Sequence, residues 1–399
     1  MNEDPAILLT PPGQELLARL AAERDGGSLA VAERLRREYP AGLVATAMAQ
    51  RELRLAAEAK FSRAAQMLFT RAGYEQSSSE AIAGYRAGRL SHASRVADLC
   101  CGIGGDLIAL AAASDVLAVD RDETHARLAL HNAAVYGRAE HVMAVVADVR
   151  DVPLAGLDAV FIDPARRAGP GAATGPRRFR SGTSEPPLDW CLALTGQVEA
   201  VCIKAAPGIP VELIPPAWEA EFIAEARDLK ESVLWSPSLA SAPDAAHGRR
   251  RATVLTPSAP RTLVAHPGDP VPLREPGEFL LDPNPAVTRA GLVEDLARAL
   301  GGDIAKIDPQ IAFLTLDRDV RTPFARTLSV KHSAPWHEKQ FAQRLRELDV
   351  GAVDIRRRGL AGDVDQIRRR LKLAGKTRAT IVITRVSDKP WGLICTDPA

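Results

Sequence analysis

The clearest pattern in the chain is a series of short apolar runs that alternate with turns and helical stretches. Each run has the length and composition of a buried strand. The runs lie at residues 96–99, 116–120, 142–147, 158–162, 198–204, 221–224 and 252–255. Between the first two, the apolar run 107–113 follows a glycine turn and is expected to be helical. Strands that alternate with helices build a parallel sheet, so the pattern predicts a seven-stranded α/β domain.

The segments on either side of this region follow other patterns. From about Thr10 to Thr70, apolar positions recur at helical spacing, which predicts a cap of about four short helices. After residue 277, runs typical of strands and helices predict an α+β sandwich, with one helix expected over 286–300. The expected domains are therefore a helical region over 1–73, the α/β domain over 74–256, a proline-rich linker over 257–276 and the α+β domain over 277–399.

The turn after the first strand has the composition of a cofactor-binding loop. Asp98 and Cys100 precede Gly102, Gly104 and Gly105, and these glycines remove Cβ atoms where the backbone turns sharply onto a helix N-terminus. A dinucleotide fingerprint requires a third glycine, whose position is occupied by Leu107. The neighbouring Asp106 would repel a pyrophosphate. S-Adenosylmethionine carries no phosphate, and we therefore expect it as the cofactor.

Acidic residues end three further predicted strands. Asp120 follows the second strand, where a carboxylate accepts hydrogen bonds from both hydroxyls of a ribose. Asp148 follows the third strand, on the side of the adenine, and Asp163 with Pro164 follows the fourth. Since the carboxyl ends of parallel strands meet at one edge of a sheet, these acids are expected to surround one ligand.

With these motifs the chain resembles the class I S-adenosylmethionine-dependent methyltransferases over about residues 75 to 255. The segment from Ser78 to Ala83, combined with the glycine turn, is similar to the trimethylguanosine synthase catalytic domain. The C-terminal region resembles a THUMP-like, ferredoxin-like appendage. The resemblance implies a Rossmann-like methyltransferase domain that binds the cofactor through Asp98, Cys100 and the glycines, with Glu75 and Gln76 at its methionine end. Ser77 and Glu80 are expected to form a capping box there.

Mechanistic expectations centre on the fourth strand. Methyl transfer is an in-line displacement, and Asp163 at the strand end is the expected acceptor of a hydrogen bond or a proton from the target atom, with Pro164 shaping its loop. Amino-directed enzymes usually place an aromatic residue soon after this pair, whereas here Ala165 and Arg166 follow, as in enzymes that act on ring carbons. Ring-carbon chemistry requires a cysteine nucleophile, and no cysteine is assigned that role.

The loop after Pro164 is rich in arginine. Arg166, Arg167 and Phe179 are the expected substrate-binding residues, because guanidinium groups contact phosphates and an aromatic ring stacks on bases. From residue 350 onward the sequence contains eleven Lys or Arg and only five acids, so this part of the chain is a second basic region. These features favour RNA as the partner. A small-molecule or protein methyltransferase and a non-catalytic S-adenosylmethionine-binding protein are the alternatives.

Composition adds few restrictions. The chain has 399 residues and a formal net charge of +1, and its apolar runs are too short to span a bilayer. Its first residues lack the pattern of a signal peptide, and five cysteines at low density fit a reducing cytoplasm. The spacing of His and Cys predicts no metal site. The oligomeric state, the target base and the target atom are not indicated.

Overall fold

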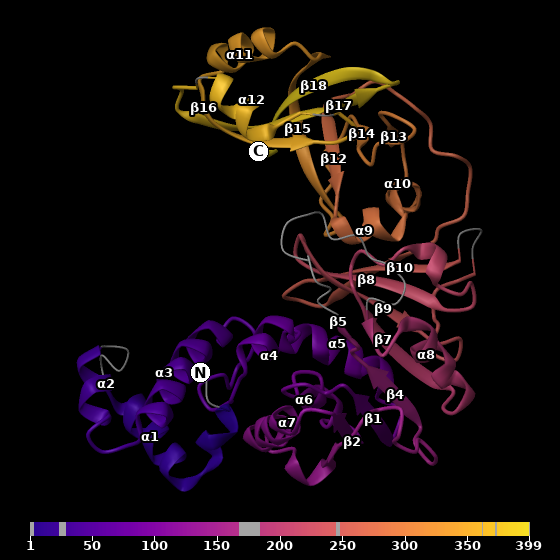
Figure 1. The fold of residues 1–399 in the computed structure, drawn as a ribbon. Helices are drawn as coiled ribbons and strands as arrows, with labels where there is room; N and C mark the ends of the chain where they lie inside the picture. Colours follow the sequence, from indigo (N-terminus) through magenta and orange to yellow (C-terminus); the bar gives the residue numbers. More distant parts are fainter. Residues whose placement is uncertain are drawn as a thin grey trace. The chain divides into compact units, whose positions relative to one another are not determined.

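A computed structural model describes residues 4–23, 29–166, 184–244, 248–360, 362–371 and 373–398 (Figure 1). The chain divides into two compact units. The first comprises Met1–Glu219 and Ser232–Ala240, and the second comprises Ala220–Glu231 and Ser241–Ala399. No helix in the described ranges combines the length and the apolarity needed to cross a membrane.

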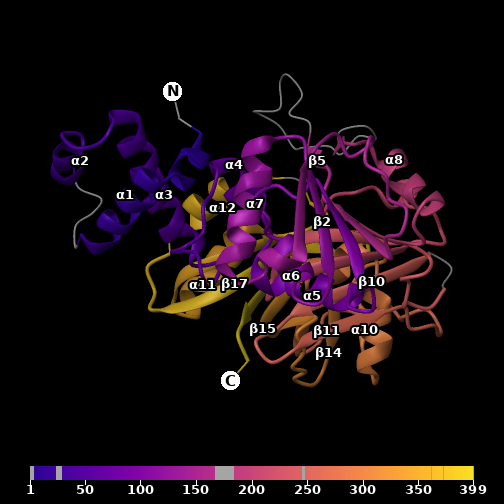
Figure 2. The same cartoon turned by 90° about the horizontal axis from the view of Figure 1, so that it is seen from below.

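The first unit begins with helices. They are η1 (Pro5–Leu9), α1 (Pro11–Ala22), α2 (Leu29–Leu35), α3 (Ala41–Ala57), α4 (Arg71–Gln76) and α5 (Glu80–Leu90). Prolines in the first turns of η1 and α1 lack the amide hydrogen that a helix start leaves unbonded. The apolar faces of η1, α1, α2 and α3 share one core with Ile103, Ile108 and Leu128 of the α/β domain. In Figure 2 the indigo helices accordingly lie beside α7.

The sheet of the first unit has the strand order β9-β7-β4-β1-β2-β3. The strands are β1 (Arg95–Leu99), β2 (Asp115–Asp120), β3 (Val142–Val146), β4 (Ala159–Ile162), β7 (Ala200–Ala205) and β9 (Asp228–Trp235), of which residues 232–235 belong to this unit. All neighbours are parallel except β9, which runs antiparallel to β7. The connecting elements are α6 (Leu107–Leu110), α7 (Glu123–Val135), η2 (Ala139–His141), β5 (Ala165–Arg166), β6 (Ser184–Glu185), α8 (Leu188–Ala193), η3 (Leu194–Gly196) and η4 (Val211–Leu213).

The second unit contains residues 220–225 of β8 (Glu219–Glu225), together with β10 (Arg249–Leu255) and β11 (Pro260–Val264). A seven-stranded sheet of order β13-β14-β12-β15-β18-β17-β16 follows among the described residues. Its strands are β12 (Phe279–Pro283), β13 (Ala305–Lys306), β14 (Leu314–Leu316), β15 (Ala325–Pro335), β16 (Val350–Arg357), β17 (Thr377–Val386) and β18 (Lys389–Thr396). Its helices are α9 (Pro285–Ala290), α10 (Val293–Leu300), α11 (Glu338–Glu347) and α12 (Val364–Leu371).

Several local expectations require correction. The helix expected over 286–300 is broken between α9 and α10, because Gly291 takes a left-handed conformation with φ 73° and ends α9. The segment expected to be a linker contains β11, whose Pro260 lies at the first position of the strand, where its missing amide hydrogen is tolerated. Strand β9 was not expected. The predicted capping box is wrong, since Ser79 rather than Ser77 caps α5.

Candidate active site

The carboxyl ends of the parallel strands bring the predicted acids to one edge of the sheet. Asp98 lies in β1, Asp120 ends β2 and Asp163 directly follows β4. Asp148 comes two residues after β3 and is half-buried. The register of β1 with β2 and β4 places Asp98 between Ala118 and Phe161. Parallel pairing is therefore the reason that residues far apart in the sequence share this edge.

The glycine turn adopts the backbone that its composition predicts. Gly102 and Gly104 have φ 54° and 83°, in the left-handed region. A Cβ on Gly104 would lie 3.0 Å from Cα of Ala129 in α7, so glycine is required there for close packing. A Cβ on Gly105 would lie 3.2 Å from Cβ of Ser77, whereas a Cβ on Gly102 would enter open space. Gly102 thus faces the region in which a ligand can lie.

Cys100 shares the left-handed conformation, with φ 62°, although it is not a glycine. It is half-buried, and burial raises the pKa of its thiol well above the ordinary value. The adjacent Cys101 is buried, and its amide donates to the Val119 carbonyl oxygen at 3.1 Å. Both side chains are therefore protonated at neutral pH, and they shape the turn rather than supply a nucleophile.

Asp120 is fixed by its own hydrogen bonds. Its carboxylate accepts from the amides of Gly102 and Asp122, each at 2.9 Å, and the His125 ring nitrogen Nδ1 lies 3.7 Å away. Burial raises the pKa of Asp120, but His125 and the two amides lower it by more, so the carboxylate stays ionised. The same contact raises the pKa of His125. Asp120 is thus an oriented acceptor beside the glycine turn.

Asp98 is the least satisfied acid of the site. Its side chain is buried, and neither carboxylate oxygen has a hydrogen-bond partner among the described residues. Burial raises the pKa of Asp98 well above its ordinary value, and the nearby Asp106, Asp163 and Asp120 raise it further. A buried carboxylate without a partner costs stability unless a ligand supplies a donor. Asp98 fits a ligand with an ammonium group.

A chain of alternating charges runs across the same edge. Arg86 of α5 is buried, forms an ion pair with Asp106 and donates to the Ser78 hydroxyl at 2.9 Å. The Lys204 ammonium of β7 lies 2.6 Å from Asp163 and 3.9 Å from Asp106. Burial raises the pKa of Asp106, but Arg86 and Lys204 lower it by more. Two cations thus partly balance four carboxylates in a small volume.

Lys204 and Arg86 were not expected from the sequence. Lys204 interrupts an otherwise apolar strand near its carboxyl end, as the acids do in their strands. A charged residue at this position could have indicated that Lys204 belongs to the site. Arg86 gave no signal, because a single arginine on an amphipathic helix usually faces solvent. Its burial depends on Asp106 and on the face of the Phe161 ring, whose centroid lies 5.3 Å from its guanidinium carbon.

The remaining expected site residues lie further out. Glu75 and Gln76 end α4 and are exposed. The segment that holds them is anchored, because Lys60 Nζ donates to the carbonyl oxygens of Tyr74 and Ser77 at 2.7 and 2.9 Å. Pro164 is half-buried beside Asp163. Arg167 and Phe179 lie outside the described residues, and of Arg166 only the backbone in β5 is described.

Glu80 has a different role from the predicted one. Its carboxylate accepts from the amide and the hydroxyl of Ser62, at 2.9 and 3.0 Å, and from the Tyr136 hydroxyl. Two basic residues of the helical region bind backbone carbonyl oxygens: Arg54 Nε donates to that of Met67 and Arg63 Nη1 to that of Val135. The contacts of Glu80 and Arg63 fasten the helical region to the α/β domain, whereas that of Arg54 lies within the helical region.

Neither Cys191 nor Cys202 is suited to nucleophilic catalysis. Cys191 in α8 is fully buried, and burial raises the pKa of its thiol to about 12. Cys202 lies in the apolar core of β7 and is also fully buried. Within the described residues no group of three or more His, Cys, Asp or Glu side chains is arranged to hold a metal ion.

Comparisons with known proteins agree with this arrangement. Residues 93–182 match the family RNA cap guanine-N2 methyltransferase, residues 325–397 match THUMP domain-like, and residues 3–57 match a domain of unknown function. Two uncharacterised S-adenosylmethionine-dependent methyltransferases, from two strains of Mycobacterium tuberculosis, are each 36% identical over 327 residues, covering 80% of this chain and 85% of theirs. A solved structure described as a methyltransferase of Porphyromonas gingivalis shares the fold at 20% identity, with a TM-score of 0.72 over 90% of this chain and 92% of that one.

The strand order, the glycine turn and the acids at the strand ends define a class I methyltransferase fold, as the sequence predicts. The chain belongs to the family of S-adenosylmethionine-dependent methyltransferases. It is therefore an enzyme whose cofactor is S-adenosylmethionine, joined to a THUMP-like C-terminal domain.

Proposed function

We propose that this methyltransferase acts on RNA. The observation that carries the proposal is the match of residues 93–182, which include the glycine turn and Asp163, to the RNA cap guanine-N2 methyltransferase family. The THUMP domain-like match at residues 325–397 supports the same substrate class. A nucleic-acid substrate and five free cysteines also support a cytoplasmic location.

The cofactor is held by residues of β1, β2 and the turn between them. Asp120 accepts from the ribose hydroxyls, and Asp98 provides the carboxylate for the methionine ammonium group. Gly102, Gly104 and Gly105 let the cofactor lie against the backbone, with Cys100 at the start of the turn. Asp148 faces the adenine side, and Glu75 and Gln76 lie at the methionine end. The unpartnered oxygens of Asp98 support this assignment.

When bound, S-adenosylmethionine supplies an electrophilic methyl group on a sulfonium. The protein then has to hold the target atom in line with that group and exclude water. Asp163 accepts a hydrogen bond from the target and takes the proton that the target loses after methylation. Lys204 orients Asp163 through the 2.6 Å contact, and Pro164 shapes the loop behind it. Arg166, Arg167 and Phe179 are proposed to contact the RNA.

An exocyclic amine of guanine is the first candidate for the target. The matched family acts on guanine N2. Ring-carbon methylation would need a thiolate, and burial keeps the thiols of Cys191 and Cys202 from that role. Against the amine stands Ala165 at a position where amino-directed enzymes usually carry an aromatic residue. Identification of the modified nucleoside distinguishes methylation of the exocyclic amine from methylation of a ring carbon.

The direct test is transfer of labelled methyl from S-adenosylmethionine to separate cellular pools of RNA, DNA and protein, with Asp163→Ala as the control. We expect label in RNA that nuclease releases, with the modified nucleoside identified by mass spectrometry. Label in protein or in a small-molecule fraction, and not in RNA, would show that the substrate is a protein or a small molecule instead. Cofactor binding without label in any pool would favour a non-catalytic protein.

A further inference from the structure

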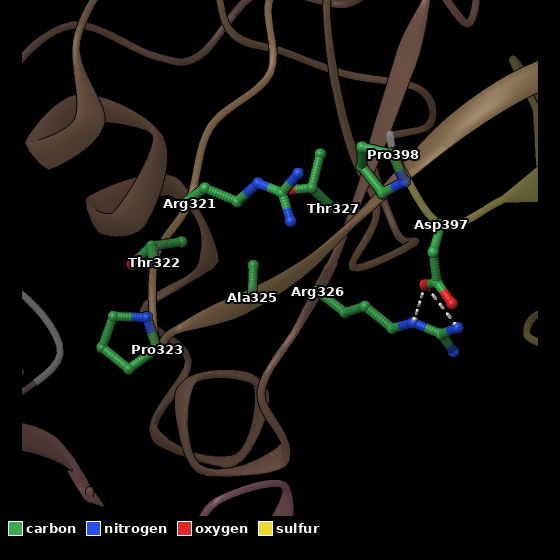
Figure 3. A pocket seen from close by; sticks show the side chains of 8 residues that line it. All are labelled: Arg321, Thr322, Pro323, Ala325, Arg326, Thr327, Asp397 and Pro398. Atoms are coloured by element: carbon green, nitrogen blue, oxygen red, sulfur yellow. Dashed lines mark hydrogen bonds and ion pairs between the residues drawn. The ribbon is translucent and has the colours of Figure 1, made fainter.

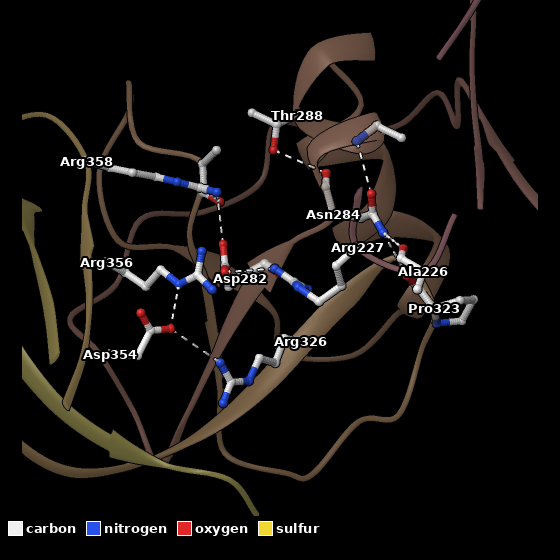
Figure 4. A network of polar contacts seen from close by, with 12 residues as sticks. Ala226, Arg227, Asp282, Asn284, Thr288, Pro323, Arg326, Asp354, Arg356 and Arg358 are labelled. Atoms are coloured by element: carbon white, nitrogen blue, oxygen red, sulfur yellow. Dashed lines mark hydrogen bonds and ion pairs between the residues drawn. The ribbon is translucent and has the colours of Figure 1, made fainter. Parts of the chain in front are cut away.

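The second unit contains a cluster of four arginines around two aspartates (Figure 4). The members are Arg227, Arg326, Arg356, Arg358, Asp282 and Asp354, and we call them the arginine cluster. They come from four parts of the fold: the turn before β9, the start of β15, the end of β16 with the residue after it, and the end of β12. None of them belongs to the methyl-transfer site.

One half of the cluster is structural. Asp282 is buried and forms ion pairs with Arg227 at 2.8 Å and with Arg358 at 2.9 Å. Arg358 is also held by the carbonyl oxygen of Ala312 at 3.1 Å and lies over the Phe313 ring. Two guanidinium groups thus balance the charge of one buried carboxylate, and this half of the cluster is a contact within the fold.

The other half is more open. Asp354 lies 3.0 Å from Nε of Arg356 and 4.0 Å from Nη1 of Arg326, and Arg326 also binds Asp397 at 2.8 Å. About half of the Arg356 side chain is exposed. Its two terminal amino groups make no hydrogen bond or ion pair within the described part of the chain, although they are the pair that binds an oxyanion in bidentate geometry.

The arginines are close enough to repel one another. Burial lowers the pKa of Arg227; Asp282 opposes this, and Arg356, Arg326 and Arg358 lower it further. The four arginines exceed the three nearby aspartates, including Asp397, by one positive charge. An arrangement that holds like charges together gains free energy when an anion enters. The exposed terminal amino groups of Arg356 mark the place of entry.

A pocket adjoins the cluster at Arg326 (Figure 3). Its volume is about 560 Å³, and besides Arg326 its lining includes Arg321, Thr322, Pro323, Thr327 and Pro398. No aromatic side chain lines it among the described residues. The pocket therefore offers cations, threonine hydroxyls, proline faces and the carboxylate of Asp397, which is paired with Arg326, but no ring on which a base could stack.

We propose that Arg356 and Arg326 form a phosphate site for the backbone of an RNA strand, with the adjoining ribose in the pocket beside Thr322 and Arg321. The proposal rests on the RNA substrate proposed above and assigns part of its binding to these residues. Phosphate contacts from arginine position an RNA without reading its sequence, and the lining without aromatics fits this role. Binding at this site thus depends on salt and little on sequence.

Two neutral variants of opposite expected effect test the site. With a fluorescently labelled single-stranded RNA of mixed sequence, Arg356→Gln is expected to weaken binding about tenfold and to reduce the slope of log affinity against log salt by about 0.7, the value for one phosphate on a single strand. Asp354→Asn removes the acid that competes with phosphate for Arg356, so it is expected to tighten binding severalfold. A purely structural role of the pair would not improve binding when the acid is removed.

Arg368→Gln is the matched control. Arg368 is an exposed arginine on α12 of the same unit, paired with Asp365 at 3.1 Å, and its loss changes the net charge by the same amount. We expect it to leave affinity and salt slope unchanged. Equal losses in Arg356→Gln and Arg368→Gln, or wild-type affinity in Arg356→Gln, would overturn the site. Melting temperatures establish that each variant is folded.

The outcome for methyl transfer separates this proposal from the substrate proposal. If the wild type methylates RNA, Arg356→Gln is expected to raise KM for RNA and leave kcat unchanged, since the site lies outside the catalytic machinery. Methylation of RNA with an unaltered KM in Arg356→Gln would reject the phosphate site alone. Failure of the wild type both to bind and to methylate RNA would reject the substrate class and the site together.

Discussion

The ammonium nitrogen of Lys204 in β7 lies 2.6 Å from a carboxylate oxygen of Asp163, which directly follows β4. The pair lies where methyl transfer is proposed, and Lys204 also approaches Asp106 at 3.9 Å. An ammonium held between two carboxylates fixes the orientation of both. Lys204 is therefore a positioning residue for Asp163.

Replacement of Lys204 by methionine removes this charge and keeps the apolar stem. We expect kcat to fall by about 100-fold, the lower end of what a positioned proton acceptor contributes, while cofactor affinity changes little. Lys204→Arg restores the charge and is expected to recover part of the rate. The measurement is steady-state methyl transfer, with calorimetric titration of S-adenosylmethionine. Loss of cofactor binding as large as the loss of rate would contradict the positioning role.

Asp120 and Asp163 are expected to divide binding and chemistry between them. Asp120→Ala removes an oriented acceptor from the ribose and also frees the amide of Gly102. We expect cofactor affinity to fall at least about 100-fold, because hydrogen bonds to a charged group contribute about 1.5–3 kcal/mol each. Asp163→Ala is expected to bind the cofactor with nearly wild-type affinity and to lose turnover. Equal loss of binding in both variants would reject this division.

Two glycines of the same turn are expected to respond differently to alanine. Gly104→Ala places a Cβ 3.0 Å from the Ala129 backbone and strains a left-handed residue, so we expect a loss of about 2–3 kcal/mol in the free energy of unfolding. In Gly102→Ala the added Cβ enters open space, so the free energy of unfolding falls only by the cost of a left-handed alanine, about 1 kcal/mol. Its Cβ points to the proposed cofactor, so its main effect is weaker cofactor binding. Urea unfolding without cofactor and calorimetric titration measure the two effects.

Asp98→Asn is expected to stabilise the cofactor-free protein and weaken cofactor binding. Burial raises the folded-state pKa of Asp98, so its contribution to stability is favourable below the unfolded pKa and is lost as the pH rises through the folded pKa. At neutral pH the asparagine avoids this cost. Thermal melts near pH 7 should show a higher Tm, by roughly 2–4 °C for each kcal/mol recovered. A lower Tm without cofactor would show that Asp98 is already satisfied.

The contact between His125 and Asp120 makes part of the stability dependent on pH. Since Asp120 raises the pKa of His125 in the folded protein, the stabilisation is complete below the unfolded value of about 6.5 and is lost as the pH rises through the folded value. Asp120 has a lowered pKa, so its part is lost only in acid, below about pH 4. We expect His125→Gln to reduce Tm more at about pH 5.5 than at about pH 8.5. An equal reduction at both values would exclude the charged pair.

Much of the α/β domain follows from local physics. Apolar runs of strand length predicted β1, β2, β3, β4, β7, β8 and β10, and the glycines after Leu99 predicted a tight turn because few other residues accept that backbone. The acids were placed at strand ends because each stands at the end of one of these apolar runs. Strand β9 was missed, since its polar first half does not show the pattern of a buried strand. The roles of the expected site residues, those of Asp148, Glu75 and Gln76 included, stay predictions.

The partners of the charged residues were decided by the tertiary structure. Lys204 meets Asp163 because β7 lies next to β4, and Arg86 is buried because α5 packs near Asp106. Likewise Arg358 reaches Asp282, although β15, β18 and β17 separate β16 from β12 in the sheet. By itself the sequence determined most of the elements of the α/β domain, the glycine turn and the cofactor class, because these depend on residues adjacent along the chain. The order of the strands and the packing of helices on the sheet depend on the whole core, and they decided which charges meet.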